Sequence, residues 1–353
     1  MSDNCFIGQR IIKVDDTFWI ISTNHNAIWK CNDSFEIVDY LIFEDEEEKD
    51  NLFRAIVCIE HVIYCFPFNA RNAYAIDTEL NTICKISINY CNKSDFSIME
   101  KFSYAFIADN FIICVGRGIK GFLKYDLYNG KTSIVSYSHI FHKNFLCSLS
   151  HCIIAGKAYV VSVVGADIIE FDFRNESIKL FNLSEFCNKN LSTVMNYNNN
   201  IYITNDRHEL LKLNNECKVL KIFQIREWKD NAIRASSFEK NRRWFVGNAT
   251  GTILIETNNN NMIFRVEDKV EKNYGYYFTA VEYYDNKLYL QLRKNGKVMC
   301  INFDENKMYY LYISIKPGLM TQYKSDIFRL VSNNGKLMLE SSDINLNDLV
   351  LFI

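Results

Sequence analysis

The sequence predicts an all-β fold: a single β-propeller built from four-stranded antiparallel blades. The first observation behind this prediction is a unit of short apolar strands that recurs about every 42–49 residues, the period of propeller blades. The second is composition, because 21 Tyr and 26 Phe accompany many Ile and Val residues, which suit a pleated, half-buried surface. The third is that only 2 Pro residues interrupt the sequence.

The repeat has a countable register. In each unit a strand is followed by a polar turn and a second strand. That second strand ends in an Asx or similar residue, after which a hairpin leads to a further strand. One more apolar strand precedes each copy, for example FRAIV and FTAVE. Four strands, A to D, therefore form each unit, and radial stacking of the units would bury both faces of every sheet. The residues that close strand C are Asn32, Asp77, Asp126, Asp172, Asn214, Thr257 and Asn302.

We predict eight blades, with seven as the alternative. Seven complete units are followed by IFRLVSNNGKLMLESS and NDLVLFI, which we interpret as a truncated eighth unit. Residues 1–353 then form one domain. We expect its ring to close by pairing an N-terminal strand at about residues 3–8 with the last blade at about residues 325–353. The alternative is that blade 8 keeps three strands, because few residues separate CFIG from IIKV.

The C–D hairpins YAIDTELNTICKI and LKYDLYNGKTSIV resemble those of kelch-like and quinoprotein-like (PQQ-type) propellers. The resemblance covers nearly the whole sequence. The sequence lacks the Gly-Gly doublet of kelch repeats, the terminal dipeptide of tryptophan–aspartate repeats and the tryptophan docking motifs of quinoprotein dehydrogenases. The resemblance therefore implies a fold but no activity, and we expect no quinone or other cofactor.

Charge and composition restrict the classes of partner. Lys plus Arg number 40 against 42 Asp plus Glu, so neither nucleic acid nor an anionic membrane is expected to bind. No secretory signal and no apolar run of about 18 residues is present. The 12 Cys residues include no Cys-x-x-Cys pair and many lie in apolar runs, which favours a reducing compartment. We expect a cytoplasmic protein and a monomer.

Two groups of residues are interpreted as structural. The recurrent Asx residues could form a ring of carboxylates, but Asx side chains commonly bond the backbone in tight turns. The segment SHIFHKNFLCSLSHC holds residue types that bind zinc, yet alternation along a strand would send His151 and Cys152 to opposite faces, and the spacing matches no zinc finger. We therefore predict no metal site from His139, His142, Cys147, His151 and Cys152.

The candidate binding face is formed by the turns between strands B and C and by the connections from strand D to the next strand A. Arg offers a planar donor fork for carboxylate or phosphate, and Asn offers both a donor and an acceptor. Tight turns favour Asn and Gly for backbone reasons, so the Arg residues carry more of the signal. The candidate ligand-binding residues are Arg54, Arg71, Asn72, Arg117, Asp167, Asp206, Arg207, His208, Arg234, Asn248 and Arg293.

Arg54 and Arg234 differ from the other candidates because each begins the innermost strand of its unit. Ser103, Ser192 and Thr279 occupy the comparable positions in other units. Two Arg residues near the mouth of a central channel would attract an anion. Alternatively, each pairs with a neighbouring acid, such as those in EDEEEKD. Both interpretations stay open.

The sequence favours a binding module that presents this polar, Arg- and Asn-rich face to a protein, peptide or glycan. The alternative is an enzyme (a lyase, cyclase or hydrolase) with its site at the mouth of the central channel, and a third possibility is a structural scaffold. The sequence has no phosphate-binding loop, no Gly-x-Ser-x-Gly elbow and no His-Glu-x-x-His motif. We therefore favour binding over catalysis and assign no catalytic residue.

Overall fold

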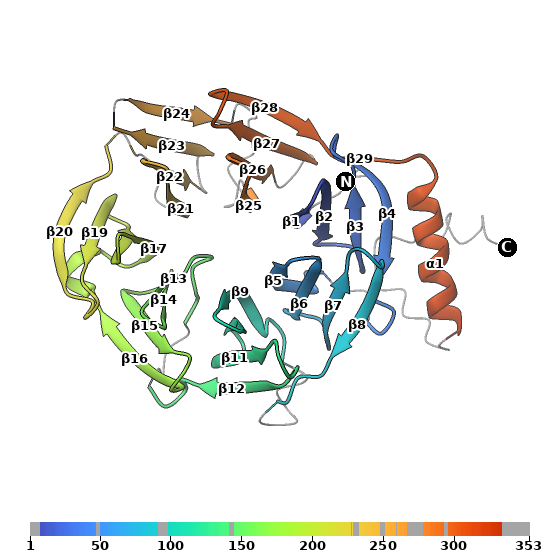
Figure 1. The fold of residues 1–353 in the computed structure, drawn as a ribbon, viewed down its shortest axis with the longest axis horizontal. Coiled ribbons are helices and arrows are strands. Elements are labelled where there is room, and N and C mark those ends of the chain that lie inside the picture. The colour runs from blue at the N-terminus through green and yellow to red at the C-terminus, as the bar shows by residue number, and fades with distance from the viewer. Residues whose placement is uncertain are drawn as a thin grey trace. The chain divides into compact units, whose positions relative to one another are not determined.

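A computed structural model describes residues 8–46, 50–90, 98–140, 145–226, 228, 233–247, 251–258, 260–266, 278–292 and 296–333. Its strands form seven meanders of four consecutive antiparallel strands, each of which is called a blade (Figure 1). The protein divides into two compact units. The first, Met1–Ser87 with Phe278–Ile353, contains blades 1, 2 and 7, and the second, Ile88–Tyr277, contains blades 3 to 6.

The strands of the first unit are β1 (Gly8–Val14), β2 (Thr17–Ser22), β3 (Ala27–Cys31) and β4 (Glu36–Ile42) in blade 1; β5 (Phe53–Ile59), β6 (Val62–Pro67), β7 (Ala73–Asp77) and β8 (Thr82–Ile86) in blade 2; and β25 (Phe278–Tyr284), β26 (Lys287–Leu292), β27 (Lys297–Asn302) and β28 (Lys307–Tyr312) in blade 7. Strand β1 lies beside both β25 and β5, so blade 1 stands between blades 7 and 2.

The strands of the second unit are β9 (Phe102–Ala108), β10 (Phe111–Gly116), β11 (Gly121–Asp126) and β12 (Thr132–Ser136) in blade 3; β13 (Cys152–Ile154), β14 (Lys157–Val161), β15 (Asp167–Asp172) and β16 (Ser177–Asn182) in blade 4; β17 (Leu191–Tyr197), β18 (Asn200–Asn205), β19 (Glu209–Leu213) and β20 (Val219–Gln224) in blade 5; and β21 (Ile233–Glu239), β22 (Arg242–Gly247), β23 (Thr252–Thr257) and β24 (Asn261–Arg265) in blade 6. A short 3₁₀ helix, η2 (Ser184–Phe186), follows blade 4.

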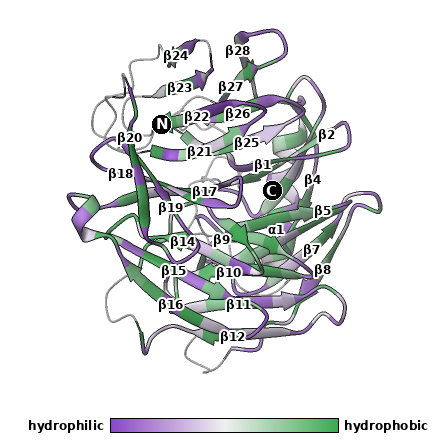
Figure 2. Cartoon of the chain, turned by 60° about the vertical axis from the view of Figure 1, so that its left-hand side comes forward, coloured by the Kyte–Doolittle hydropathy of each residue, from purple (hydrophilic) through white to green (hydrophobic). Residues whose placement is uncertain are grey.

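Within each unit, the core consists of apolar clusters between successive blades. In β14, Ala158 and Val160 pack into the cluster shared with blade 3, while Tyr159 and Val161 pack into the cluster shared with blade 5. Figure 2 shows hydrophobic residues along the strands and hydrophilic residues at many of the turns. Burial of each large apolar residue contributes about 1.5–3 kcal/mol. Packing between blades therefore outweighs exposed ion pairs between blades, which contribute about 0–1 kcal/mol each.

The seven A–B hairpins all have two-residue loops. Such loops adopt the primed turn types, which match strand twist and need a positive φ. The first loop residue has φ between 40° and 51° in every blade. These residues are Asp15, Glu60, Asp109, Ala155, Asn198, Lys240 and Asp285.

The recurrent residues that close strand C have the structural role that the sequence predicted. In blade 1, the Asn32 side-chain oxygen accepts the amides of Ser34 (3.1 Å) and Glu36 (3.0 Å). The corresponding side-chain oxygen accepts a backbone amide of the hairpin in each of the other six blades as well. These side chains are therefore engaged in holding the C–D turns.

The prediction of an eighth blade is wrong, and the alternative of seven blades is supported. The segment IFRLV, interpreted as the first strand of blade 8, lies in the helix α1 (Leu319–Asn333). Leu319, Tyr323 and Ile327 recur every four residues and are buried on one helix face. This helical spacing is difficult to recognise in the sequence, because a short apolar run also fits a strand. Residues 1–7 and 334–353 lie outside the described residues, so ring closure by pairing residues 3–8 with residues 325–353 stays a prediction.

After blade 7 the polypeptide returns to the outer edge of blade 1. Strand β29 (Ser314–Ile315) pairs in parallel with β4. The Ser314 amide donates to the Phe35 carbonyl (3.1 Å), and the Lys316 amide donates to the Ile37 carbonyl (3.0 Å). Helix α1 then packs against β4 (Figure 1). This β29–α1 segment gives blade 1 a fifth strand and covers its outer edge.

Tyr323 is the centre of the contact between α1 and blade 1. Its side chain is 1% exposed, and its ring centroid lies 4.9 Å from that of Trp29 and 5.5 Å from that of Tyr40. The Tyr323 hydroxyl accepts a hydrogen bond from the Asn26 amide (2.9 Å). The Tyr40 hydroxyl donates to Asp326 on the same helix (2.7 Å). Apolar packing and hydrogen bonds therefore both hold α1 against blade 1.

His25 belongs to the same contact. Its ring packs edge-on against Trp29 (5.4 Å) and Tyr323 (5.6 Å), and its Nδ1 is 2.8 Å from the Ser22 hydroxyl. Burial, with a contribution from Lys324, lowers the pKa of His25 to about 4. The imidazole is therefore neutral in the folded protein at neutral pH.

In the part of the protein that the structure describes, no helix is long and apolar enough to cross a membrane.

Removal of the Tyr323 ring should destabilise the fold. We expect Tyr323→Ala to lower the free energy of unfolding by about 3–5 kcal/mol, because it empties a buried aromatic site. Tyr323→Phe keeps the ring and leaves the Asn26 amide without its acceptor, so a loss of about 1–3 kcal/mol is expected. Urea denaturation measures both. Equal stability of wild type and Tyr323→Ala would show that α1 does not hold blade 1.

Acidification should loosen the α1 contact through His25. The folded-state pKa of about 4 lies below the unfolded value, so this contribution is complete above pH 6.5 and is lost as pH falls through 4. Between pH 7 and pH 5 the loss is about 2 kcal/mol. His25→Gln should remove most of this pH dependence in denaturation curves, whereas His61→Gln, at a half-buried site in blade 2, should keep it. The same pH dependence in both variants would contradict the assignment.

Candidate functional site

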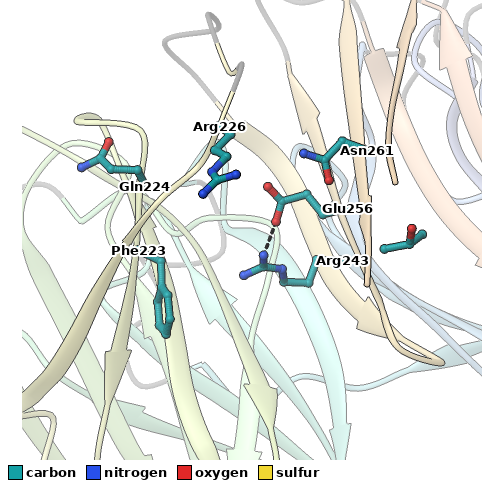
Figure 3. Close-up of a pocket in the computed structure, with 7 residues that line it drawn as sticks. Phe223, Gln224, Arg226, Arg243, Glu256 and Asn261 are labelled. Carbon is teal, nitrogen blue, oxygen red and sulfur yellow. Dashed lines mark ion pairs between the residues drawn. The ribbon is translucent and has the colours of Figure 1, made fainter. Parts of the chain in front are cut away.

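A cavity of about 370 Å³ lies in the groove between blades 5 and 6, within the second unit. Strand β20 and the residues that follow it form one wall, and strands β22, β23 and β24 form the other (Figure 3). The lining residues are Phe223, Gln224, Arg226, Arg243, Glu256, Thr257 and Asn261.

Local strand pairing places the charged residues of this groove. Arg243 on β22 is the direct cross-strand partner of Glu256 on β23. Glu256 immediately precedes Thr257, whose hydroxyl accepts the Asn260 amide (3.0 Å) and holds the C–D turn. On the opposite wall Phe223 packs against the apolar cluster between blades 5 and 6. The groove is therefore built on two packed blades.

The electrostatics of the groove centre on Glu256. Arg243 forms an ion pair with Glu256, which is 8% exposed. Burial raises the pKa of Glu256, and the charges of Arg243 and Arg226 partly offset that rise. Arg226 makes no hydrogen bond or ion pair with the described residues, although its guanidinium faces Glu256 in Figure 3. Two guanidinium groups and one carboxylate give the groove a net positive charge.

The groove has the chemistry of a carboxylate-binding site. Guanidinium groups donate paired hydrogen bonds to carboxylates, and the side-chain amides of Gln224 and Asn261 add both donors and acceptors. Acid–base catalysis usually needs a further titratable group or a nucleophile beside the carboxylate. Among the described residues, those lining the cavity supply one carboxylate and no His, Cys or Lys.

The predicted candidates on the B–C turns are held by the D–A connections. Asp206 follows β18, and its carboxylate accepts the amides of Asn188 (2.7 Å), Lys189 (2.7 Å) and Asn190 (3.1 Å). The neighbouring Arg207 donates to the side-chain oxygen of Asn188 (3.2 Å) and to the carbonyls of residues 185 (3.2 Å) and 187 (3.0 Å). These two side chains fasten the connection from blade 4 onto the turn of blade 5.

A similar arrangement occurs at blade 2 with the partners reversed. The carboxylate of Glu46, in the D–A connection from blade 1, is 8% exposed. It accepts the amides of Arg71 (2.6 Å) and Asn72 (2.8 Å), the side-chain amide of Asn72 (2.8 Å) and the Tyr74 hydroxyl (3.0 Å). Glu46, part of the acidic segment EDEEEKD, therefore holds the B–C turn of blade 2.

The remaining turn candidates also have neighbours that the structure identifies. Arg117 forms an ion pair with Glu100 (2.8 Å), and Asp167 accepts a hydrogen bond from Asn182 (2.8 Å). His208 has a φ of 61° within the turn after β18. The other two candidates, Asn248 and Arg293, lie outside the described residues.

The two inner-strand candidates sit at β-bulges. Arg54 is left out of the β5–β6 register between Phe53 and Ala55, and Arg234 is left out of the β21–β22 register in the same way. The corresponding residue is skipped in β1, β9, β17 and β25 as well. Bulges redirect side chains and occur often near functional sites. Arg54 also contacts Asn51 (3.2 Å) and lies 4.0 Å from the Phe68 ring.

The structure therefore spreads the described candidates over both units and does not gather them in the groove cavity. Sequence reasoning missed Arg226, Arg243 and Glu256. The pair Arg243–Glu256 follows from counting strand register in blade 6, but the approach of Arg226 depends on how blade 5 packs against blade 6. Among the described residues, no group of three or more His, Cys, Asp and Glu is placed to hold a metal ion.

Comparison with known proteins identifies the fold. No protein-family model matches the sequence, and no curated protein matches it either. Among solved structures, a streptogramin B lyase aligns with a TM-score of 0.57 and 11% identity over 76% of this protein and 85% of its own length. The computationally designed Ika8 protein aligns with a TM-score of 0.52 and 8% identity over 87% and 96%. BamB from Moraxella catarrhalis aligns with a TM-score of 0.50 and 12% identity over 70% and 68%.

These neighbours are β-propeller proteins, and the protein is accordingly an all-β, single β-propeller with seven four-stranded antiparallel blades. Identities of 8–12% establish the fold alone. The kelch-like resemblance stays an interpretation of the hairpins.

The carboxylate of Asp206 should act as a structural clamp. We expect Asp206→Ala to lower the free energy of unfolding by about 2 kcal/mol, because three amide donors lose a charged acceptor. Hydrogen exchange at residues 188–190 should accelerate locally. Lys212→Ala on β19 serves as a control in the same blade. Unchanged exchange at residues 188–190 would return Asp206 to the set of residues available for a ligand.

Proposed function

We propose that this β-propeller is a binding module for a protein or peptide, and that the groove between blades 5 and 6 receives carboxylate groups of the partner. The observation that carries this proposal is the cavity itself, where Arg226 lies beside the Arg243–Glu256 ion pair. Acidic side chains and the terminal carboxylate of a polypeptide both present the planar anion that such an arrangement recognises.

The charge of the groove favours an acidic polypeptide over a glycan. Neutral sugars are held mainly by amides and by stacking on aromatic rings, and beside a sugar the guanidinium of Arg226 would gain no charged partner. A carboxylate satisfies these donors and adds a charge-assisted bond. We therefore place the glycan second among the ligands that the sequence suggested.

The enzyme alternative has weaker support. The similarity to a streptogramin B lyase concerns the fold, which hosts many unrelated functions. Glu256 has a raised pKa, a property that catalytic acids share, but its ion pair with Arg243 is also a common structural arrangement. Binding requires only the residues that line the groove, whereas catalysis would require a further titratable group or nucleophile.

A phage-displayed library of random peptides tests the proposal. The wild-type protein should enrich peptides rich in Asp and Glu, and Arg226→Ala should weaken their binding by about tenfold or more, since a charge-assisted contact contributes about 1.5–3 kcal/mol. Glu256→Gln should strengthen it by up to about tenfold, because Arg243 loses its internal competitor. Titration calorimetry with the selected peptides measures both changes.

Arg265→Ala is the matched control, because Arg265 lies on β24 of the same blade outside the cavity lining. Its affinity for the selected peptides should equal that of the wild type. The double variant Arg54→Ala, Arg234→Ala examines the face that the sequence suggested. If that variant loses binding while Arg226→Ala retains it, the binding face lies at the inner strands and the groove proposal fails.

A further inference from the structure

The C–D hairpins of blades 1 and 5 have the same backbone geometry, which differs from that of the other blades. Among the described C–D strand pairs, β3–β4 and β19–β20 alone contain a register shift, which leaves out Val38 in blade 1 and Leu220 in blade 5. The turns agree as well, because Phe35 has a φ of 61° and Cys217 has a φ of 57°. The two outer strands therefore begin with the same backbone geometry.

On blade 1 this geometry receives a strand. The carbonyls of Phe35 and Ile37 accept the amides of Ser314 (3.1 Å) and Lys316 (3.0 Å) as β29 pairs in parallel with β4. The register makes Cys217 and Val219 the equivalent residues of blade 5. Among the described residues, no strand pairs with the outer edge of β20. The edge that binds β29 on blade 1 therefore recurs on blade 5, where the described residues place no strand beside it.

The apolar surface beside this edge is also repeated. On blade 1 the cross-strand pair Trp29–Tyr40 packs against Tyr323 of α1. The equivalent pair on blade 5 is Leu211–Ile222, in which Leu211 is already buried in the cluster between blades 4 and 5 and Ile222 faces outward. Ile222 is 44% exposed and the bulge residue Leu220 is 57% exposed. Exposed aliphatic residues on an open edge strand are typical of a surface that binds another polypeptide.

The charges of the two edges are opposite. Glu36 and Asp39 of blade 1 correspond to Lys218 and Lys221 of blade 5. Lys218 already pairs with Glu216 (2.9 Å), so Lys221 carries more of the unmatched charge. The segment that docks on blade 1 brings Lys316 and therefore suits an acidic edge. A basic edge calls for an acidic segment, which disfavours a second copy of the β29–α1 segment.

We propose that the outer edge of β20 binds an extended acidic segment of a partner protein as a parallel fifth strand, with apolar side chains of that segment on Leu220 and Ile222. Strand β20 runs from Val219 to Gln224, and Gln224 lines the cavity, so a strand parallel to β20 would run toward the groove. A parallel strand would lead its carboxylates toward Arg226. This inference deepens the proposed function and rests on it in taking a polypeptide as the ligand.

The test uses two synthetic peptides based on residues 313–330 of this protein. One has the native sequence, and the other carries Lys316→Glu and Lys324→Glu. Fluorescence anisotropy with the full-length protein should show the acidic peptide binding at least about tenfold more tightly than the native one. Lys221→Glu in the protein should reverse this preference. Hydrogen exchange should show protection of the amides of residues 217–222 by the acidic peptide.

Lys179→Glu is the matched control, because Lys179 is 64% exposed on β16, the outer strand of blade 4. It should leave both affinities unchanged. Equal affinity for the two peptides, no saturable binding, or protection elsewhere than β20 would overturn the docking edge. If library-selected peptides still bind in a way that depends on Arg226, the proposed function survives that result. Loss of Arg226-dependent binding, with β20 still protected, would instead overturn the groove.

Discussion

Burial of apolar blade faces against the neighbouring blades of the same unit is the constraint on which the rest of the structure depends. In β14, neighbouring residues such as Tyr159 and Val160 belong to different clusters, so blade 4 needs a neighbour on each side. A four-stranded sheet with two apolar faces is not stable alone. This packing fills most of the space between neighbouring blades with apolar side chains, although a few polar side chains such as Thr193, Thr204 and Gln291 are buried as well.

The edges follow from the same constraint, because stacking covers faces and leaves edges open. Outer strands need protection from unwanted pairing, and the protein protects β4 by adding β29 and α1. Blade 5 has the same bulged edge as blade 1, but Lys221 replaces the acidic Asp39. Backbone groups determine that a strand can be added, whereas side-chain charge determines which strand is added. Under the docking proposal, the same backbone geometry serves two different occupants.

Local chemistry explains which features were predictable from the sequence. The strands and the residues closing strand C, such as Asn32 and Thr257, depend on turn chemistry within a few residues, and the structure confirms them. Helix α1 was missed because the apolar run after Ile327 fits a strand as well as a helix. The groove was missed because Arg226 and Glu256 come from different blades, and their proximity depends on packing that the sequence does not show.

Residue type therefore says less about function than the neighbours of each side chain. The guanidinium of Arg207 is occupied by Asn188 and by two backbone carbonyls, which makes it part of the scaffold. Arg243 is occupied by Glu256, but that partner is a carboxylate of the kind a ligand could present. Under the proposed function, an incoming acid competes with Glu256 for Arg243, while Arg226 offers additional charge. The proposed affinity is then a difference between the free energies of two similar ion pairs, which favours selective and reversible binding over tight binding.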